Sequence, residues 1–314
     1  MYDYIEISKQ LYKDTANLIH LKERNKFTSS GSTLYHIPGN KPLKLIHDPE
    51  SNKINISGSI PYFLNGHNFS TNNKEFYQGF EYLEGLLQIS LFDSVVEKFE
   101  FFQIVETPMK ANTIIKNHLA PEGMGTFINK NGNGRTFEDN LYKLKMYNPQ
   151  KRIFQVANSE TQIQAEGLGF DRNKQFTKFE VHYKKPYQVL NQGHNVILSD
   201  LLNPEFIRKI ENNYLQQYNR IMKPKSVKIP ATKKELTTDK IILLALAEST
   251  GSTGQSVKEI LYSFLKQIPD TILTKEDKKA RQAQIRKLLK IIQEEGINKY
   301  DLTELLKEKM QYIN

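Results

Sequence analysis

Four segments in the first 200 residues alternate apolar and polar side chains, and this period of two most constrains the fold. The alternation is clearest at 53–59, 98–106, 141–147 and 176–183. Successive side chains of a β-strand point to opposite faces of its sheet, so these segments are predicted to be strands. Patterns typical of helices lie between them, at 72–96 and around 108–119. The first part of the chain is therefore predicted to be α+β, with a mainly antiparallel sheet and packed helices.

A proline-rich basic segment divides the chain. A helix is predicted over 202–222, where Asn203 can cap the first turn and Pro204 supplies the fixed φ that a helix start tolerates. Residues 223–237 then contain two prolines and five lysines with little to bury, as in a linker. We expect one domain over 1–222, a basic linker over 223–237 and a second domain over 238–314.

The second domain is predicted to be a small all-α domain, because its segments each carry one apolar stripe and short connections join them. Its third helix is predicted to begin at the Thr274 cap and to end at Gly296. One face of this helix is strongly basic. A face of this kind can neutralise DNA phosphates, or it is simply a solvated helix surface. The basic residues are Lys275, Lys278, Lys279, Arg281, Arg286, Lys287 and Lys290.

Composition narrows the class of protein. Hydrophobic residues make up 38% of the 314 positions, and no apolar run approaches the ~20 residues of a membrane span. The start lacks the pattern of a secretion signal, so a cytoplasmic protein is expected, without a membrane partner. There is no cysteine. Disulfides, thiolate metal sites and a cysteine nucleophile are excluded, and any metal must be held by His, Asp or Glu.

The charge favours an anionic partner. The formal net charge is +9, and the chain has 17 Phe and 16 Tyr whose rings can stack on unpaired bases. Nucleic acid is therefore the first partner to consider. A Lys-rich and Asn-rich composition that merely reflects an AT-rich genome would give the same charge.

Four short motifs follow one another along the first domain. They are Gly66-His67-Asn68, then Lys98-Phe99-Glu100, then Tyr147 with Lys151, and last Lys178-Phe179-Glu180 followed by Lys184 and Lys185. Their order and spacing resemble the gene-two replication initiators of filamentous phages and their plasmid relatives. The resemblance covers about residues 50 to 215. It departs from the family pattern at Glu100, where the family usually has Asp, so that the carboxylate is kept with a longer reach.

The resemblance implies an enzyme that opens rolling-circle replication by nicking a duplex origin. In this family a tyrosine attacks the phosphodiester and retains the 5′ phosphate, so that the ends can be rejoined later. Carried over by position, the nucleophile is Tyr147. The first domain is then a nicking endonuclease domain, and its partners are origin DNA, single-stranded and duplex, together with a host helicase or polymerase.

A tyrosine needs help in such a reaction, because its phenol titrates near ~10. A divalent cation can draw charge from the phosphate oxygens, and Mg²⁺ or Mn²⁺ prefers oxygen ligands with at most one imidazole. Glu100 and Glu180 lie amid alternating apolar residues and can converge if their strands pair. His67 can complete the set, or it only braces the turn in which it lies.

Several basic and aromatic residues are candidates for contacts with the reacting phosphate or with DNA. Lys145 or Lys151 can favour the phenolate or hold the phosphate. Tyr183 and Tyr187 are reserve nucleophiles. The predicted DNA contacts are Lys130, Arg135, Arg152, Tyr183, Lys184 and Lys185, although Lys130 and Arg135 equally fit the tip of a solvated hairpin.

The sequence thus predicts a metal-dependent, site-specific DNA nicking and joining enzyme. A protein of another class also fits. It would be a non-catalytic DNA-binding regulator that uses the basic helical C-terminal domain, and it would need no special role for Tyr147 or for the two glutamates.

Overall fold

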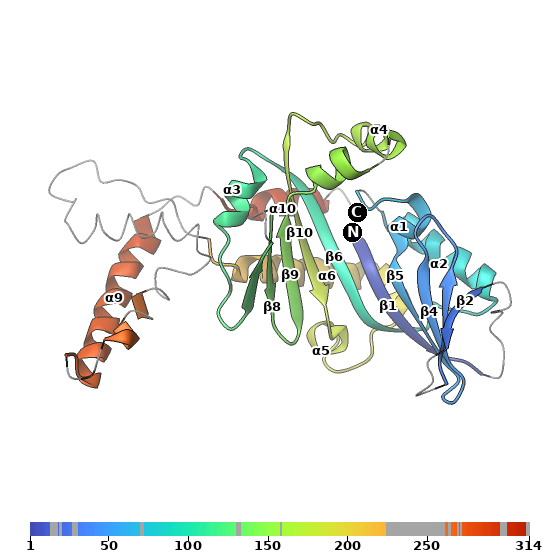
Figure 1. Ribbon diagram of the computed structural model, residues 1–314, viewed down its shortest axis with the longest axis horizontal. Coiled ribbons are helices and arrows are strands. Elements are labelled where there is room, and N and C mark those ends of the chain that lie inside the picture. Colours follow the sequence, from blue (N-terminus) through green and yellow to red (C-terminus); the bar gives the residue numbers. More distant parts are fainter. Residues whose placement is uncertain are drawn as a thin grey trace.

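The computed structural model describes residues 1–12, 18, 21–26, 31–69, 72–129, 133–157, 159–223, 261–262, 265–268, 270, 272–295 and 300–311. Its centre is one sheet of ten strands in which every neighbouring pair is antiparallel. The strand order is β2-β3-β4-β5-β1-β6-β10-β9-β8-β7. The mixed fold with a large antiparallel sheet that the sequence predicts is therefore confirmed. Figure 1 shows the sheet running across the whole body of the molecule.

The strands are β1 (Tyr2–Gln10), β2 (Lys22–Lys26), β3 (Thr33–Ile37), β4 (Leu43–Asp48), β5 (Lys53–Ser59), β6 (Val95–Thr107), β7 (Gly125–Ile128), β8 (Gly134–Glu138), β9 (Tyr142–Tyr147) and β10 (Gln175–Tyr183). The helices are α1 (Ile60–Asn65), α2 (Asn73–Leu87), α3 (Ala111–Lys116), α4 (Ser159–Gly167), α5 (Pro186–Leu190), α6 (Pro204–Arg220), α9 (Lys275–Glu295) and α10 (Thr303–Gln311). Short helical turns lie at Arg152–Val156 and Leu198–Leu202. The four alternating segments identified in the sequence correspond to β5, β6, β9 and β10.

Local signals explain where the main helices begin. Asn72 caps α2, and Glu75 reaches back to the cap residue, which makes a capping box. Asn203 caps α6 ahead of Pro204, as the sequence predicts. At the start of α9 the hydroxyl of Thr274 accepts the Asp277 N–H at 3.2 Å.

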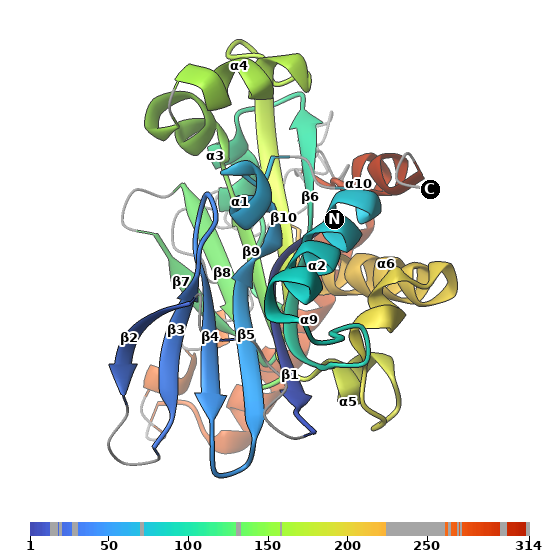
Figure 2. The same ribbon diagram turned by 90° about the vertical axis from the view of Figure 1, so that its right-hand side faces the viewer.

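One face of the sheet carries the main hydrophobic core. α2, α6 and α10 cover this face, as Figure 2 shows from the side. Large rings from the central strands fill the layer between sheet and helices, including Tyr2, Phe99, Phe101, Phe179 and Tyr183. Burial of this apolar area, at about 25 cal/mol per Å², is the main force that fixes the sheet against its helices.

α10 belongs to this core and not to a separate C-terminal domain. Leu302, Leu306 and Met310 are buried among residues of β6 and α6. The backbone N–H of Leu302 also donates to the hydroxyl of Tyr218 at 2.7 Å. The predicted division into domains is therefore wrong for this helix, because an amphipathic stripe in the sequence does not say which surface covers it. The predicted linker, apart from Lys223, and the first two predicted helices of the second domain lie mainly outside the described residues.

The other face of the sheet is only partly covered. A second, smaller hydrophobic cluster lies there beneath α4 and its flanking loops, and it includes Phe69, Phe102, Ile153, Phe170 and Phe176. Beside this cluster the face carries charged side chains from β1, β6, β9 and β10. Among the described helices, none is both long enough and apolar enough to cross a membrane.

Candidate active site

A β-bulge in β1 brings an unexpected carboxylate to the partly covered face. Tyr2 pairs with Phe101 and Ile5 with Phe99, so that Asp3 and Tyr4 together oppose the single residue Glu100. One extra residue in a strand bends it and re-aims a side chain. Tyr2 and Ile5 can therefore both stay in the core while Asp3 faces the same side as Glu100.

Three carboxylates converge at this point. Asp3 from β1, Glu100 from β6 and Glu180 from β10 each offer an oxygen, and these oxygens all lie within 4.8 Å of one another. Their side chains are 9%, 11% and 4% exposed. Within the described part of the chain, this triad is the one cluster of acidic or imidazole groups arranged to hold a metal ion. We call Asp3, Glu100 and Glu180 the acidic triad.

Two lysines partly neutralise the acidic triad. The ammonium of Lys178 is 2.8 Å from Glu180 Oε1 and 3.4 Å from Asp3 Oδ2, and its side chain is 2% exposed. Lys145 donates to Glu100 and lies 3.5 Å from Glu180 Oε2. Three carboxylates against two ammonium groups leave one negative charge in excess, so the triad retains capacity for a further cation.

The surroundings keep Lys178 and Glu100 charged. Burial alone would lower the pKa of the Lys178 ammonium, but the charges of Glu180 and Asp3 raise this pKa above its ordinary value. Burial would likewise raise the pKa of Glu100, yet the hydrogen bond from His182 and the charge of Lys145 bring that pKa well below its usual range. His182 Nδ1 lies 3.1 Å from Glu100 Oε1.

Tyr147, at the end of β9, contacts the triad directly. Its hydroxyl donates to Glu180 Oε1 at 2.6 Å. Burial, together with the negative charge of Glu180, raises the pKa of this phenol well above its ordinary value, although Lys178 acts in the opposite direction. The resting tyrosine is therefore protonated, and a carboxylate that can accept its proton lies next to it.

The stretch 58–68 contributes to the site through Ser59 and Asn68. The hydroxyl of Ser59 donates to Asp3 Oδ1 at 2.5 Å and also caps the first turn of α1. The α1 helix ends at Gly66, whose φ of 72° belongs to the left-handed region that glycine adopts freely. This tight end places Asn68 so that its amide donates to Asp3 Oδ2. The carboxylate of Asp3 is thus held on both oxygens.

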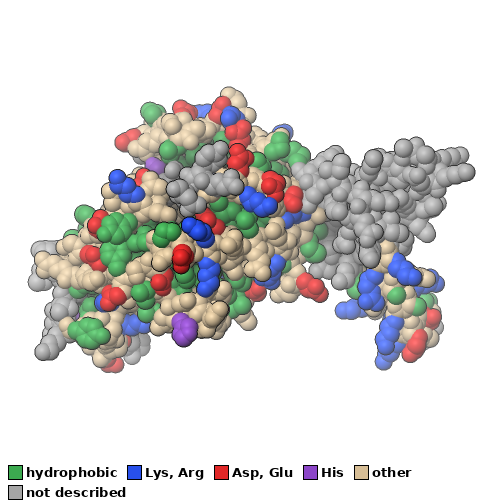
Figure 3. Space-filling model, turned by 180° about the vertical axis from the view of Figure 1, so that it is seen from behind, with side chains coloured by type: hydrophobic (Ala, Val, Ile, Leu, Met, Phe, Trp, Pro, Cys, Tyr) green, Lys and Arg blue, Asp and Glu red, His purple; other side chains and the backbone are tan. Residues whose placement is uncertain are grey.

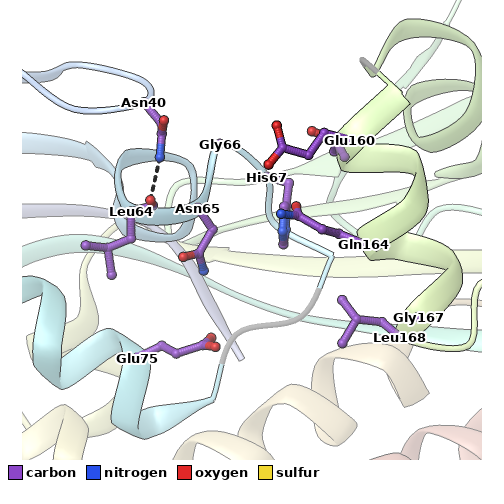
Figure 4. A pocket seen from close by; sticks show the side chains of 11 residues that line it. Asn40, Leu64, Asn65, Gly66, His67, Glu75, Glu160, Gln164, Gly167 and Leu168 are labelled. Atoms are coloured by element: carbon purple, nitrogen blue, oxygen red, sulfur yellow. Dashed lines mark hydrogen bonds between the residues drawn. The ribbon is translucent and has the colours of Figure 1, made fainter.

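His67 does not join the acidic triad. It lines a separate polar pocket of about 760 Å³ with Asn40, Glu75, Glu160 and Gln164 among others. Figure 4 shows the imidazole there, with Gln164 beside it. His67 stacks on Phe69 at 4.8 Å, its Nδ1 has no hydrogen-bond partner, and burial lowers its pKa. The prediction of His67 as a metal ligand is corrected to Asp3, because His67 faces this other pocket and it is Asn68, the next residue, that contacts Asp3.

Two further predicted residues lie where they cannot contact DNA. Arg135 is buried, and its guanidinium donates to the carbonyls of Lys116 and His118 at 3.3 and 2.5 Å. Tyr183 is fully buried in the main core, with its hydroxyl 3.4 Å from the Ile210 carbonyl. Alternation in a strand predicts that Tyr183 faces away from Glu180 and His182, and that face is the core. Tyr183 is therefore excluded both as a DNA contact and as a reserve nucleophile.

The remaining predicted residues lie at or near the surface. Lys184 donates to Glu138 Oε1 and to the carbonyl of Asp139, both at 2.6 Å. Lys151 and Lys185 are exposed. The guanidinium of Arg152 lies over the ring of Tyr62, 4.8 Å from its centroid. Tyr187 is 36% exposed on α5, whereas Lys130 lies outside the described residues.

Sequence reasoning missed Asp3, and it named Lys178 and Asn68 only as motif residues without a role in the site. A carboxylate between apolar residues in the segment Tyr2–Ile7 was the available signal for Asp3, although a bulge cannot be read from a single strand. Lys178 is two residues before Glu180 and therefore on the same strand face, which alternation alone could have shown.

The chain matches no protein-family model and no curated protein.

Proposed function

We propose that this chain is a DNA nicking and joining enzyme that initiates rolling-circle replication, with Tyr147 as the nucleophile. The observation that carries the proposal is the 2.6 Å hydrogen bond from the Tyr147 hydroxyl to Glu180, a member of the acidic triad. A phenol alone has many uses in a protein. A protonated phenol that touches one of three clustered carboxylates has the parts that covalent phosphoryl transfer requires.

The triad fits a divalent cation. It offers three carboxylate oxygens, the donor type that Mg²⁺ and Mn²⁺ prefer, and it has one negative charge in excess of its lysines. Asp3, Glu100 and Glu180 Oε2 would hold the ion, because Glu180 Oε1 already accepts from Tyr147 and Lys178. When bound, Mg²⁺ or Mn²⁺ supplies a Lewis acid that draws charge from the non-bridging phosphate oxygens.

The cleavage step follows from these contacts. Glu180 Oε1 accepts the phenolic proton as Tyr147 Oη forms a bond to phosphorus. The bond from phosphorus to the 3′-oxygen breaks, and this oxygen keeps the electron pair. The proton gained by Glu180 then passes to the 3′-oxygen through solvent. The products are a 5′-phosphotyrosine and a free 3′-hydroxyl, which a host polymerase can extend. The reverse step rejoins the strand without an external energy source.

Lys178 and Lys145 have complementary roles in this scheme. Lys178 is fixed between Asp3 and Glu180, so it holds Glu180 in place to accept the proton. Lys145 lies on the same strand face as Tyr147, two residues away, and is the less buried of the two lysines. It is the cation suited to the pentavalent phosphate as negative charge develops there.

A nicking assay tests the proposal. The substrate is a supercoiled plasmid that carries the replication origin of the genetic element that encodes the protein. It is incubated with the protein and Mn²⁺ or Mg²⁺. The wild type is expected to give nicked circles with protein attached to the 5′ end, and Tyr147→Phe to give none. Tyr82→Phe is the matched control, because Tyr82 is exposed on α2, which covers the opposite face of the sheet from the triad. Equal nicking by Tyr147→Phe and Tyr82→Phe would refute the assignment.

A non-catalytic DNA-binding regulator is the second candidate. The basic face of α9 favours it, since Lys275, Lys279, Arg281, Arg286 and Lys287 are all exposed. Figure 3 shows Lys and Arg side chains gathered on this helix, which stands away from the sheet. A regulator would bind the plasmid and leave it uncut at every divalent ion concentration, so the same assay separates the two candidates.

A further inference from the structure

A basic groove begins at the acidic triad and continues along the strands. It has a volume of about 520 Å³. Glu100, a member of the triad, and its partner Lys145 both line the groove. The groove is lined by five lysines, three glutamates and His182. Since Glu100 already pairs with Lys145 and His182, the rest of the groove carries four lysines against two glutamates.

The strand register arranges the cations in successive steps. Lys178 pairs with Tyr147, Glu180 with Lys145, and His182 with Lys143, while Lys184 lies directly after the end of β10, two residues beyond His182. Side chains on one face of a strand repeat about every 6.7 Å, twice the rise per residue. This repeat is comparable with the spacing of neighbouring phosphates along an extended nucleic-acid strand. A cation thus stands at each step from the triad outwards.

The carboxylates in the groove do not block an anion. Lys98 pairs with Glu6 at 2.9 Å, and Glu138 lies 3.8 Å from Lys143 and 2.6 Å from Lys184. The side chains of all five residues are between a quarter and a half exposed. Half-exposed ion pairs stabilise a fold by only about 0–1 kcal/mol, so a phosphate can replace a carboxylate partner at little cost.

The groove also offers rings to unpaired bases. Tyr4 and His182 lie against each other with ring centroids 5.9 Å apart, and both line the groove. Aromatic side chains beside a cationic track are typical of single-strand binding, because any base can stack on them. A duplex would present phosphates alone and leave these rings unused.

We infer that this groove binds the single DNA strand that leads to the acidic triad, with Lys143 and Lys184 contacting successive phosphates and Tyr4 and His182 supporting a base. The inference rests on the proposed function for the identity of the polyanion. It extends that function by naming the path that delivers the strand to Tyr147.

Salt-dependent binding tests the groove. A fluorescent oligodeoxythymidylate is titrated with the full chain over a range of salt concentrations, and anisotropy reports binding. Lys143→Ala combined with Lys184→Ala is expected to weaken binding about tenfold and to reduce the slope of log affinity against log salt by about 1.4, at about 0.7 for each phosphate that is no longer neutralised. Lys209→Ala is the control, because Lys209 is exposed on α6, which covers the opposite face.

The outcomes separate the groove from the catalytic proposal. Unchanged affinity and slope in the double variant, equal loss in Lys209→Ala, or no binding by the wild type would overturn the groove. If the wild type nicks its plasmid and the double variant binds normally, the nicking function stands without the groove. If the double variant loses binding while no preparation nicks DNA, the groove stands and the nicking function fails.

Discussion

Replacing Glu180 by Gln should destabilise the fold strongly, and replacing its partner Lys178 as well should recover most of the loss. Glu180 accepts from Lys178 at 2.8 Å and from Tyr147 at 2.6 Å, and both charged side chains are almost fully buried. Loss of one partner from a buried ion pair costs about 3–5 kcal/mol, because the other charge remains unpaired. Asp3, at 3.4 Å from Lys178, keeps part of the attraction. We therefore expect the low end, about 3 kcal/mol.

The loss of about 3 kcal/mol corresponds to a fall in Tm of roughly 6–12 °C, at about 2–4 °C per kcal/mol for domains of this order of size. Lys178→Met alone should cost a similar amount, since it leaves the three carboxylates with only one lysine. In the double variant neither charge is left unpaired. The double-mutant cycle should therefore give a coupling energy of about 2–3 kcal/mol.

Urea unfolding followed by circular dichroism measures the cycle, because the chain has no tryptophan for fluorescence. Each variant is measured without divalent ions, so that only the ion pair is tested. Effects that add to within about 0.5 kcal/mol would show that Glu180 and Lys178 are not coupled. The electrostatic account of the site would then be wrong.

Three more predictions concern the metal, the pH dependence and α10. Calorimetric titration with Mn²⁺ should show affinity reduced at least about tenfold in Asp3→Asn and unchanged in His67→Ala; equal effects would restore His67 as a ligand. The folded-state pKa of Glu100 is lowered, so its stabilisation is present above its ordinary pKa of 4.5 and is lost as the pH falls through the folded value. Unfolding free energies measured from pH 6 downwards should therefore fall more steeply in the wild type than in Glu100→Gln below about pH 4.5, and parallel curves would contradict this. Leu306→Ala should lower the free energy of unfolding by about 2–5 kcal/mol, as for other buried leucines. The control Lys307→Ala, at an exposed position, should change it by less than about 0.5 kcal/mol. An equally small effect of Leu306→Ala would show that α10 does not pack in the core.

The local elements of this fold could be predicted because short-range chemistry determines them. Alternation over 176–183 indicates which face of β10 enters the main core, and the same alternation sets Glu180 and Tyr183 on opposite faces. Asn203 and Pro204 fix the start of α6 through backbone hydrogen bonding and φ, without help from distant residues. Convergence of Glu100, Glu180 and Tyr147 was predicted only on the condition that their strands pair, and the sheet meets this condition because β6, β10 and β9 are neighbours.

The rest depends on contacts between residues far apart in the chain. Asp3 reaches the triad through a bulge opposite Glu100, which only strand pairing reveals. Arg135 follows a segment rich in Asn and Gly and therefore looked like a loop residue. Its guanidinium is nevertheless buried, because it donates to carbonyls of α3 and of the loop that follows α3. The stripe on α10 indicated that the helix was amphipathic and could not indicate that β6 and α6 would cover it.

The central claim is that Tyr147 forms the covalent link to DNA, and mass spectrometry of the linked peptide tests it most directly. The protein is incubated with Mn²⁺ and its replicon DNA, digested with nuclease and protease, and searched for a peptide that carries a nucleotide remnant. The account predicts a 5′-phosphate ester on Tyr147. A remnant on any other residue, or unmodified Tyr147 in a preparation that has nicked the DNA, would contradict it.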